Sequence, residues 1–201
     1  LAAKDIGFLK QMWPMVEKAV EFALSLQQPT GEVFWAVSPT GKSWPGAILT
    51  SSSCIWHSIH NGVNIAKTLG IKRPDWKQAG NKLLKAMREH PELFDKMGEN
   101  KRRYAMNWFY PVLTGVLKGK EAIERINREW NDFIIDNWGC RVAVDEDTTA
   151  VAETSELIIA LALIGEHERA RMLLDWTLKI RDDKPGFCRG IKFPEKLACP
   201  P

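Results

Sequence analysis

The amino-acid sequence predicts an all-α protein made of antiparallel helical hairpins, in which charge-rich outer helices alternate with apolar inner helices. Apolar residues recur at helical spacing along most of the chain, and no strand-like alternation of comparable length occurs. The expected helices alternate in charge, and the connections between them alternate in length. Since short connections force neighbouring helices to pack antiparallel, these patterns together predict hairpins.

Seven helical segments are expected, each from a stripe of apolar residues with local start or stop signals. Pro14 lies in the first segment, and we expect it to begin a new helix, because a proline at the first helical position costs no hydrogen bond. Gly70 is placed to end the second segment. Short extended pieces are possible at residues 33–37 and 187–193. The helical segments span residues 5–28, 52–69, 74–89, 111–118, 120–135, 148–164 and 167–180.

Charge divides these helices into two kinds. The first, third, fifth and seventh carry Lys, Arg and Glu along one face, which is typical of helices with a solvent-facing side. The second, fourth and sixth are poorer in charge. Residues 157–164 of the sixth helix are apolar all round, so we expect that stretch to be buried on every side.

Connection lengths indicate where a functional site would lie. Long connections at residues 29–51, 91–110 and 136–147 precede the inner helices, and short turns precede the outer ones. All long loops then lie on one rim of the bundle, where binding residues usually sit. Helix N-termini on that rim favour anions and polar ligands.

Composition excludes several classes of protein. A net charge of +3 is too small to indicate a nucleic-acid partner. No apolar run approaches the roughly 20 residues needed to span a membrane. Four cysteines occur without a CxxC pair and without a histidine at ligand spacing, so we expect no metal and no cofactor. The scattered cysteines and the lack of a signal peptide favour a cytoplasmic protein with reduced thiols.

Several stretches resemble a group of bacterial proteins labelled "prenyltransferase", which share the α/α-toroid fold with six-hairpin glycosidases and terpenoid cyclases. The resemblance implies part of an (α/α)6 toroid, so that residues 1–201 form a single partial domain and the remaining hairpins are missing. Both ends are expected to be truncated, because the chain starts at Leu1 and stops at Pro201 without closing a helix. The stretches that carry the resemblance are residues 12–14, 25–28, 51–55, 106–113 and 152–156, and Trp176 with residues 181–183.

Two positions depart from the pattern of that group. Asn107 stands where an aspartate is usual, and residues 187–190 replace an aromatic pair near a glycine. These departures keep a non-catalytic, ligand-binding toroid open as one hypothesis.

An acidic run, Asp145-Glu146-Asp147-Thr148-Thr149, directly precedes or begins the sixth helix. It resembles the DxDTT form of the acid motif of class II terpenoid cyclases, which implies an isoprenoid substrate, Asp147 as the proton-donating acid and Asp145 as its helper. Neighbouring carboxylates raise one another's pKa, as such an acid requires. The alternative is that these acids cap the helix and complement its dipole.

Glu153 and Glu156 lie three residues apart and so share a face of the sixth helix. A carboxylate on an apolar helix is costly unless it is paired or faces a wet cavity. Glycoside hydrolysis needs an acid and a base across the scissile bond, and Glu153 with Asp147 or Asp145 could supply them. The alternative is a structural ion pair or a solvated helix start.

Aromatic residues in or beside the long connections are the candidates for substrate binding, because their faces stack on sugar rings and on cations. The alternative is that they close the hydrophobic rim. His57 and His60 are expected to form only hydrogen bonds, since no third metal ligand appears at a suitable spacing. The substrate-binding candidates are Trp35, Trp44, Tyr104, Asn107, Trp108 and Tyr110.

The sequence thus favours a carbohydrate-active toroid that hydrolyses glycosides by carboxylate acid–base chemistry on a small-molecule sugar. An isoprenoid cyclase or prenyltransferase-like protein that acts through residues 145–149 is one alternative. A non-catalytic ligand-binding toroid is the other.

Overall fold

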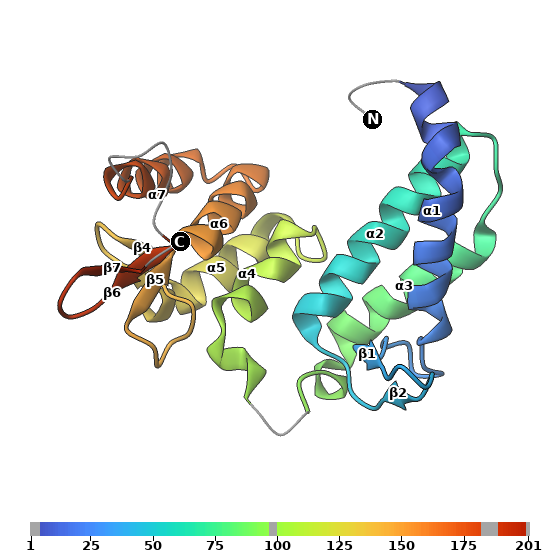
Figure 1. Ribbon diagram of the computed structural model, residues 1–201, viewed down its shortest axis with the longest axis horizontal. Helices are drawn as coiled ribbons and strands as arrows, with labels where there is room; N and C mark the ends of the chain where they lie inside the picture. Colours follow the sequence, from blue (N-terminus) through green and yellow to red (C-terminus); the bar gives the residue numbers. More distant parts are fainter. Residues whose placement is uncertain (1–4, 97–99, 182–188, 200–201) are drawn as a thin grey trace. The chain divides into compact units, whose positions relative to one another are not determined.

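The structure is a computed structural model that describes residues 5–96, 100–181 and 189–199 (Figure 1). The chain divides into two compact units, Leu1–Asn100 and Lys101–Pro201, and each is described here by itself. Both units are mainly helical, which confirms the all-α fold class. The single domain expected over residues 1–201 stays a prediction.

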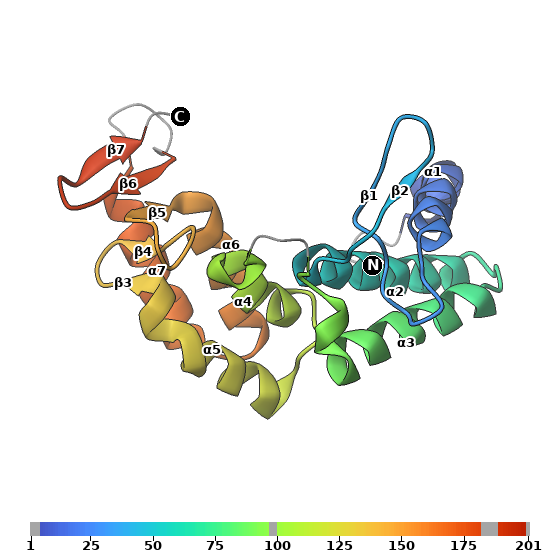
Figure 2. The same ribbon diagram turned by 90° about the horizontal axis from the view of Figure 1, so that it is seen from below.

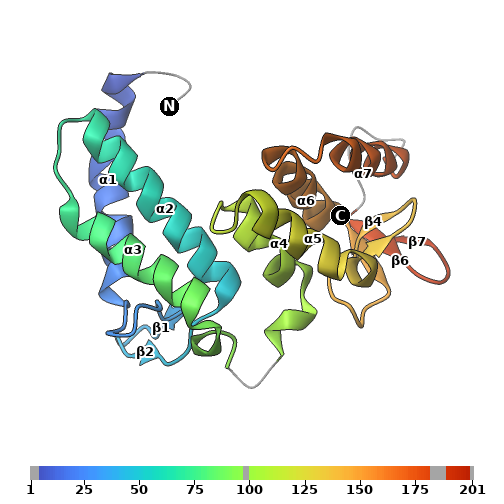
Figure 3. The ribbon, with the colours of Figure 1, turned by 180° about the vertical axis from the view of Figure 1, so that it is seen from behind.

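The described residues of the first unit contain the α-helices α1 (Ile6–Ser25), α2 (Leu49–Thr68) and α3 (Pro74–Glu89). Helix α2 packs against both α1 and α3 (Figures 1 and 3). The buried Trp76 of α3 stacks on Trp13 of α1 with ring centroids 5.5 Å apart, and the Arg73 guanidinium lies 3.9 Å from a Trp76 ring centroid. These contacts fix α1 against the start of α3.

The long connection between α1 and α2 carries a short hairpin of β1 (Ala36–Val37) and β2 (Ser43–Trp44). A 3-10 turn, η1 (Pro91–Leu93), follows α3 and brings Asp95 to the start of α2. The Leu49 amide donates to Asp95 Oδ1 at 3.2 Å, and the Asp95 amide donates to the Ala47 carbonyl at 2.8 Å. A residue 46 positions away therefore caps α2, since Ile48 at the N-cap provides no side-chain cap.

The second unit begins with the 3-10 turn η2 (Lys101–Arg103) and contains α4 (Ala105–Leu113), α5 (Gly119–Phe133), α6 (Val151–Leu163) and α7 (His167–Lys179). Helix α4 packs against α5 and α6, and α6 packs against α7. One apolar core joins the four helices. Its members include Trp108, Phe109, Phe133, Leu157, Leu161 and Leu173.

Among the described residues of the second unit, five short strands form two small sheets (Figure 2). Strands β3 (Ile134–Ile135) and β4 (Gly139–Cys140) form a hairpin after α5. Strands β5 (Thr148–Ala150), β6 (Gly190–Lys192) and β7 (Leu197–Cys199) form an antiparallel sheet in the order β5-β6-β7. Because β5 leads directly into α6, this sheet fixes the position of the first turn of α6.

Proline was misread as a helix start at two positions. Pro14 lies inside the continuous helix α1, and Pro111 lies inside α4, which begins at Ala105 instead of residue 111. A proline inside a helix leaves the carbonyl four residues earlier without its amide donor. In α4 that carbonyl belongs to Asn107, and it accepts a hydrogen bond from Arg125 Nη2 at 3.2 Å. A side chain of α5 thus replaces the missing donor, and residues 105–110 are helix instead of loop.

Two further expectations about the sixth helix were wrong. Residues 148–150 form strand β5, because they pair with β6, and α6 begins only at Val151. The stretch 157–164 is not buried on every side, since Ile159 is 53% exposed and Leu163 is 66% exposed. These two residues lie four apart, on the face of α6 that its packing partners leave uncovered.

The first unit also has exposed apolar residues. Phe8, Met15 and Phe22 of α1 are all exposed and follow one another at intervals of seven residues. Residues at this spacing lie along one side of a helix and form a continuous stripe.

Parts of two stretches named in the sequence analysis, 181–183 and 187–190, fall on residues that are not described. Residues 182–183 and 187–188, including Cys188, lie outside the described part of the chain. The extended piece expected at 187–193 is present as β6 over Gly190–Lys192.

Candidate functional site

The junction between β5 and α6 holds Glu153, a carboxyl group whose pKa is raised by its environment. Glu153 lies in the first turn of α6 and is partly buried. Burial raises the pKa of this carboxyl above its ordinary value of 4.5, and the nearby charge of Glu156 raises it further, against an opposing hydrogen bond from the backbone. No ion pair to Glu153 is found among the described residues. Glu153 therefore has the raised pKa of a proton donor.

Two neighbours define the surroundings of Glu153. The Tyr110 hydroxyl of α4 donates to Glu156 Oε1 at 3.0 Å, so α4 supports the second carboxylate of the pair. On the other side, burial raises the pKa of the Cys140 thiol of β4, and the charge of Glu153 raises it further. The Cys140 amide also donates to the hydroxyl of Thr154, the residue after Glu153, and the loss of water contacts in this region is the largest cause of the raised pKa of Glu153.

Thr154 connects the β3–β4 hairpin to α6. Its hydroxyl donates to the Ala150 carbonyl at 2.7 Å and accepts from the Cys140 amide at 2.9 Å. Gly139 makes this approach possible, because a Cβ atom there would lie 2.6 Å from Thr154 Oγ1 and its φ is +112°. The hairpin can therefore pack closely behind the first turn of α6 only with glycine at this position.

Gly139→Ala is expected to destabilise the protein by about 1–3 kcal/mol, through backbone strain and displacement of the Thr154 hydroxyl. Urea unfolding followed by circular dichroism would measure the loss. Gly165→Ala is the matched control, since Gly165 also has positive φ, +83°, but nothing lies within 4 Å of its Cβ position. Equal losses in the two variants would show that the contact with Thr154 has no energetic importance.

The acidic run occupies a different environment. Arg103 Nε donates to both carboxylate oxygens of Asp145 at 2.9 and 3.0 Å, and Arg103 lowers the pKa of the Asp145 carboxyl. The Asp147 carboxylate lies 3.5 Å from Arg141 Nη1. The side chains of Asp145 and Asp147 are 59% and 70% exposed. Asp145 is therefore held in its ionised form, the opposite of a buried neutral acid.

Two of the candidate aromatic residues lie together in the first unit. Trp35 and Trp44 are both exposed, and their rings meet edge to face with centroids 6.0 Å apart. The β1–β2 hairpin brings them together, because it pairs Trp44 with Ala36, the neighbour of Trp35. They form an exposed aromatic pair on a long connection, and their role in substrate binding stays a prediction.

The candidates from the second unit are mostly buried. The Trp108 ring is fully buried, stacks on Phe133 at 5.0 Å, and its Nε1 donates to the Arg125 carbonyl at 2.9 Å. Asn107 and Tyr110 are also buried. Trp108 is thus a core residue whose faces are covered by protein, and it offers no surface to a substrate. Burial also removes Asn107 from the substrate-binding candidates, and Tyr110 contributes a hydroxyl instead of a ring face.

Tyr104 lies at the entry to α4 and is partly buried. The Arg103 guanidinium lies 4.9 Å from its ring centroid and also donates to its hydroxyl at 3.1 Å. Since Arg103 binds Asp145 as well, Tyr104 belongs to the structural contacts of the acidic run.

Sequence reasoning missed one aromatic pair. Trp138, in the turn between β3 and β4, meets Phe193 edge to face with centroids 5.5 Å apart. Trp138 directly precedes Gly139, so it lies on the hairpin that packs behind α6. Its position inside the long connection 136–147 was the signal that could have identified it.

Within residues 5–96, 100–181 and 189–199, no three His, Cys, Asp or Glu side chains gather in a metal-binding arrangement. None of the helices in that same part of the chain is both long enough and apolar enough to cross a bilayer.

The chain is similar to a known glycosidase, the MMP endo-(1,4)-3-O-methyl-alpha-D-mannosidase of Mycolicibacterium hassiacum. The two sequences are 38% identical over 193 residues, which are 96% of this chain and 52% of that enzyme. The chain therefore spans about half the length of the curated relative it matches. No protein-family model matches the sequence. This relative is a glycosidase, in agreement with the resemblance to six-hairpin glycosidases. The prenyltransferase label stays a prediction.

Proposed function

We propose that this chain is part of a glycoside hydrolase that cleaves internal α-(1→4) bonds in a polymer of 3-O-methylmannose. The observation that carries this proposal is the 38% identity to the mannosidase, which extends over 96% of the chain. Because this identity extends along nearly the whole chain, it supports a common ancestor and a related carbohydrate substrate. The partly buried carboxyl of Glu153 then supplies the acid that glycosidic cleavage requires.

In the proposed reaction, Glu153 donates its proton to the glycosidic oxygen as the bond between that oxygen and C1 of the sugar breaks. The oxygen of a water molecule forms the new bond to C1, and a carboxylate accepts the proton that this water loses. One water molecule is consumed for each bond cleaved. The raised pKa suits Glu153 to the first step, because it keeps the carboxyl protonated at higher pH.

Asp147 is the candidate base within this chain. Its side chain is largely exposed, and its contact with Arg141 is long. Asp145 fits the role less well, since its carboxylate already accepts two hydrogen bonds from Arg103 Nε. We assign Asp145 the role of holding the loop that carries Asp147.

Exposed aromatic rings would bind the sugar. Trp35 and Trp44 form one exposed surface. Trp138 on the β3–β4 hairpin is partly buried against Phe193 and would contribute the part of its ring that stays accessible. A methylated mannose presents more apolar surface than mannose itself, and such surface stacks well on indole rings. These three tryptophans replace the buried Trp108 as the proposed sugar-binding residues.

We also propose that the helices form part of an (α/α)6 toroid whose other hairpins belong to the same longer protein. The alternation of long and short connections supports this, as does the contact between α4 and α6, the inner helices of successive hairpins. The exposed Ile159 and Leu163 of α6 provide an apolar face on which a further helix can pack. The greater length of the mannosidase supports the same proposal.

An isoprenoid cyclase is the less favoured alternative. That chemistry needs a carboxyl held neutral by an apolar site to protonate an alkene, whereas the side chain of Asp147, the acid of the motif, is 70% exposed and lies 3.5 Å from Arg141 Nη1. Its helper Asp145 is paired with Arg103, which lowers the pKa of the Asp145 carboxyl. The ion pair is instead consistent with a structural role for the acidic run.

The test is an assay of the protein at its natural length on three polymers: an α-(1→4)-linked 3-O-methylmannan, its unmethylated counterpart and an α-(1→4)-glucan. We expect shorter oligosaccharides from the methylated polymer and cleavage at least about tenfold slower for the unmethylated one, the discrimination that one buried methyl group provides. Size-exclusion chromatography of the products would show internal cleavage. If the protein leaves all three polymers intact and instead turns over a polyprenyl diphosphate, the proposal is overturned.

A further inference from the structure

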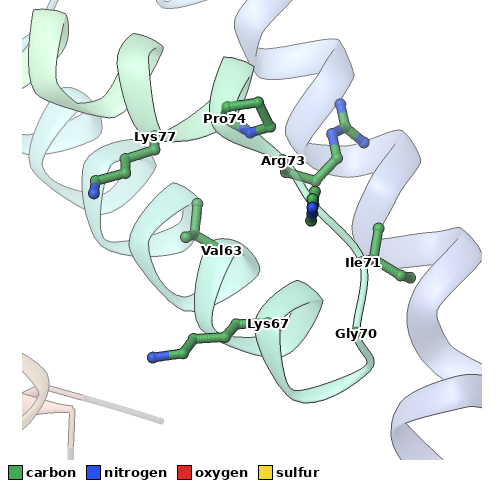
Figure 4. Close-up of a pocket in the computed structure, with 8 residues that line it drawn as sticks. Val63, Lys67, Gly70, Ile71, Arg73, Pro74 and Lys77 are labelled. Carbon is green, nitrogen blue, oxygen red and sulfur yellow. The ribbon is translucent and has the colours of Figure 1, made fainter.

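A hollow of about 460 Å³ lies where α2 and α3 meet, at the end of this hairpin that carries the short turn. Its walls come from the last turns of α2, the turn at residues 70–73 and the first turn of α3 (Figure 4). The volume lies within the range of small-molecule binding sites. The turn at residues 70–73, which lines the hollow, follows the end of α2, and the β1–β2 hairpin lies at the opposite end of that helix (Figure 1).

The turn that forms one wall is held in a defined conformation. Gly70 has a φ of +74°, its amide donates to the Lys67 carbonyl at 3.2 Å, and the Ile71 amide donates to the Ala66 carbonyl at 2.8 Å. These two bonds form a Schellman motif that ends α2. The hollow is therefore a preformed feature of the hairpin.

Arg73 holds the other side of the turn to α1. Its Nη1 lies 2.8 Å from Glu17 Oε1 and its Nη2 lies 3.1 Å from Glu21 Oε1, and it also binds the neighbouring Asp75. Figure 4 shows its guanidinium directed towards α1. The charge of Arg73 is thus compensated, and this arginine anchors the wall without being available to a ligand.

Three lysines around the hollow differ from Arg73, because their positive charges are not compensated by ion pairs among the described residues. Lys67, Lys72 and Lys77 are exposed, and none forms an ion pair within the described part of the chain. Lys67 of α2 and Lys77 of α3 extend on the same side of the hairpin, with Val63 between them (Figure 4). Their ammonium groups therefore leave a concentration of uncompensated positive charge at the edge of the hollow.

The rest of the lining is apolar. Val63 and Ile71 are partly buried and contribute aliphatic surface, and Pro74 contributes its ring. A simple anion would leave this surface exposed to water, and a neutral apolar molecule would leave the ammonium groups without a partner. The combination fits a molecule that carries both an anionic group and an apolar body.

We propose that this hollow binds a small anionic amphiphile, with its anionic group among Lys67, Lys72 and Lys77 and its apolar body over Val63, Ile71 and Pro74. Binding rests on charge-assisted hydrogen bonds to the ammonium groups and on burial of the apolar body. This site is independent of the proposed glycosidase activity, because none of its residues belongs to the carboxylate or tryptophan groups described above.

Isothermal titration calorimetry with octyl phosphate, kept below its micelle-forming concentration, tests the proposal. We expect saturable binding, with inorganic phosphate and 1-octanol each binding at least about tenfold more weakly. The double variant Lys67→Gln/Lys77→Gln should weaken octyl phosphate binding at least about tenfold. The matched control is Lys42→Gln/Lys85→Gln, which removes two exposed lysines of the same unit from outside the hollow and should bind as the parent does.

Two results would overturn the proposal. Equal binding by the two double variants would show that attraction is a general effect of positive charge. Binding to phosphatidylglycerol vesicles without binding to monomeric octyl phosphate would show a membrane-surface contact in place of a small-molecule site.

Discussion

Glu153→Gln is expected to lower kcat on the methylated mannan by a factor of about 10²–10⁴, the usual contribution of a general acid. Glutamine has nearly the same shape as glutamic acid but has no acidic proton for the leaving oxygen. Because the loss affects the reaction more than the binding of substrate, KM should change little. Steady-state kinetics would measure both constants. Glu168→Gln, which removes an exposed carboxylate of α7, is the control and should retain full activity.

The pH dependence provides a second readout for Glu153. Activity requires the protonated carboxyl, so it should fall as pH rises through the raised pKa. The charge of Glu156 is one cause of that raised pKa, so Glu156→Gln should move this fall in activity to lower pH. An unchanged profile in Glu156→Gln, together with full activity of Glu153→Gln, would remove Glu153 from the reaction.

Stability should follow the same titration. The pKa of Glu153 is raised in the folded state, so between 4.5 and that higher value the folded protein binds more protons than the unfolded chain. The free energy of unfolding must then decrease as pH rises through this window. The Glu153→Gln variant should lack that decrease, which thermal unfolding at a series of pH values can measure without any substrate.

Trp108→Ala is expected to lower the free energy of unfolding by about 3–5 kcal/mol, the cost of removing a fully buried large aromatic side chain. The substitution removes the stack on Phe133 and the donor that satisfies the Arg125 carbonyl. Both α4 and α5 lose contacts in the same core. Urea unfolding followed by circular dichroism would measure the change.

Trp44→Ala is the matched control for Trp108→Ala. Trp44 is exposed, and its main ring contact is the edge-to-face pair with Trp35, so the loss should stay below about 1.5 kcal/mol. Under the proposed function, the same change should raise KM for the methylated mannan. Equal losses of stability in the two variants would contradict the distinction between a core tryptophan and a surface tryptophan.

Helices with clear local signals could be predicted from the sequence. The expected third helix, 74–89, has the bounds of α3, because Pro74 begins it and its stripe of Trp76, Leu83 and Met87 faces the core. Helix α4 could not be placed correctly in this way. Its interior proline is tolerated because Arg125 donates to the freed carbonyl, and nothing in the sequence near Pro111 indicates a donor from α5.

Contacts between residues far apart in the sequence also explain which parts of the candidate site could not be predicted. The spacing of Glu153 and Glu156 identifies a shared helix face, and the structure brings Tyr110 to that face. The acidic neighbours of Asp145 in the sequence suggested carboxyls with raised pKa values, but Arg103, which binds Asp145 and lowers the pKa of its carboxyl, lies 42 residues earlier. The pKa of a carboxyl depends on burial and on charges that the fold brings together, so acidic residues adjacent in sequence do not reveal it.

The stripe of Phe8, Met15 and Phe22 on α1 restricts the geometry of any helix that covers it. A straight α-helix repeats every 3.6 residues, so a contact line with a period of seven drifts slowly around the helix axis. A covering helix that follows this line has to cross α1 at a shallow angle of about +20°, in the left-handed sense of a coiled coil. A steeper crossing would bury one of the three side chains and leave the others in water.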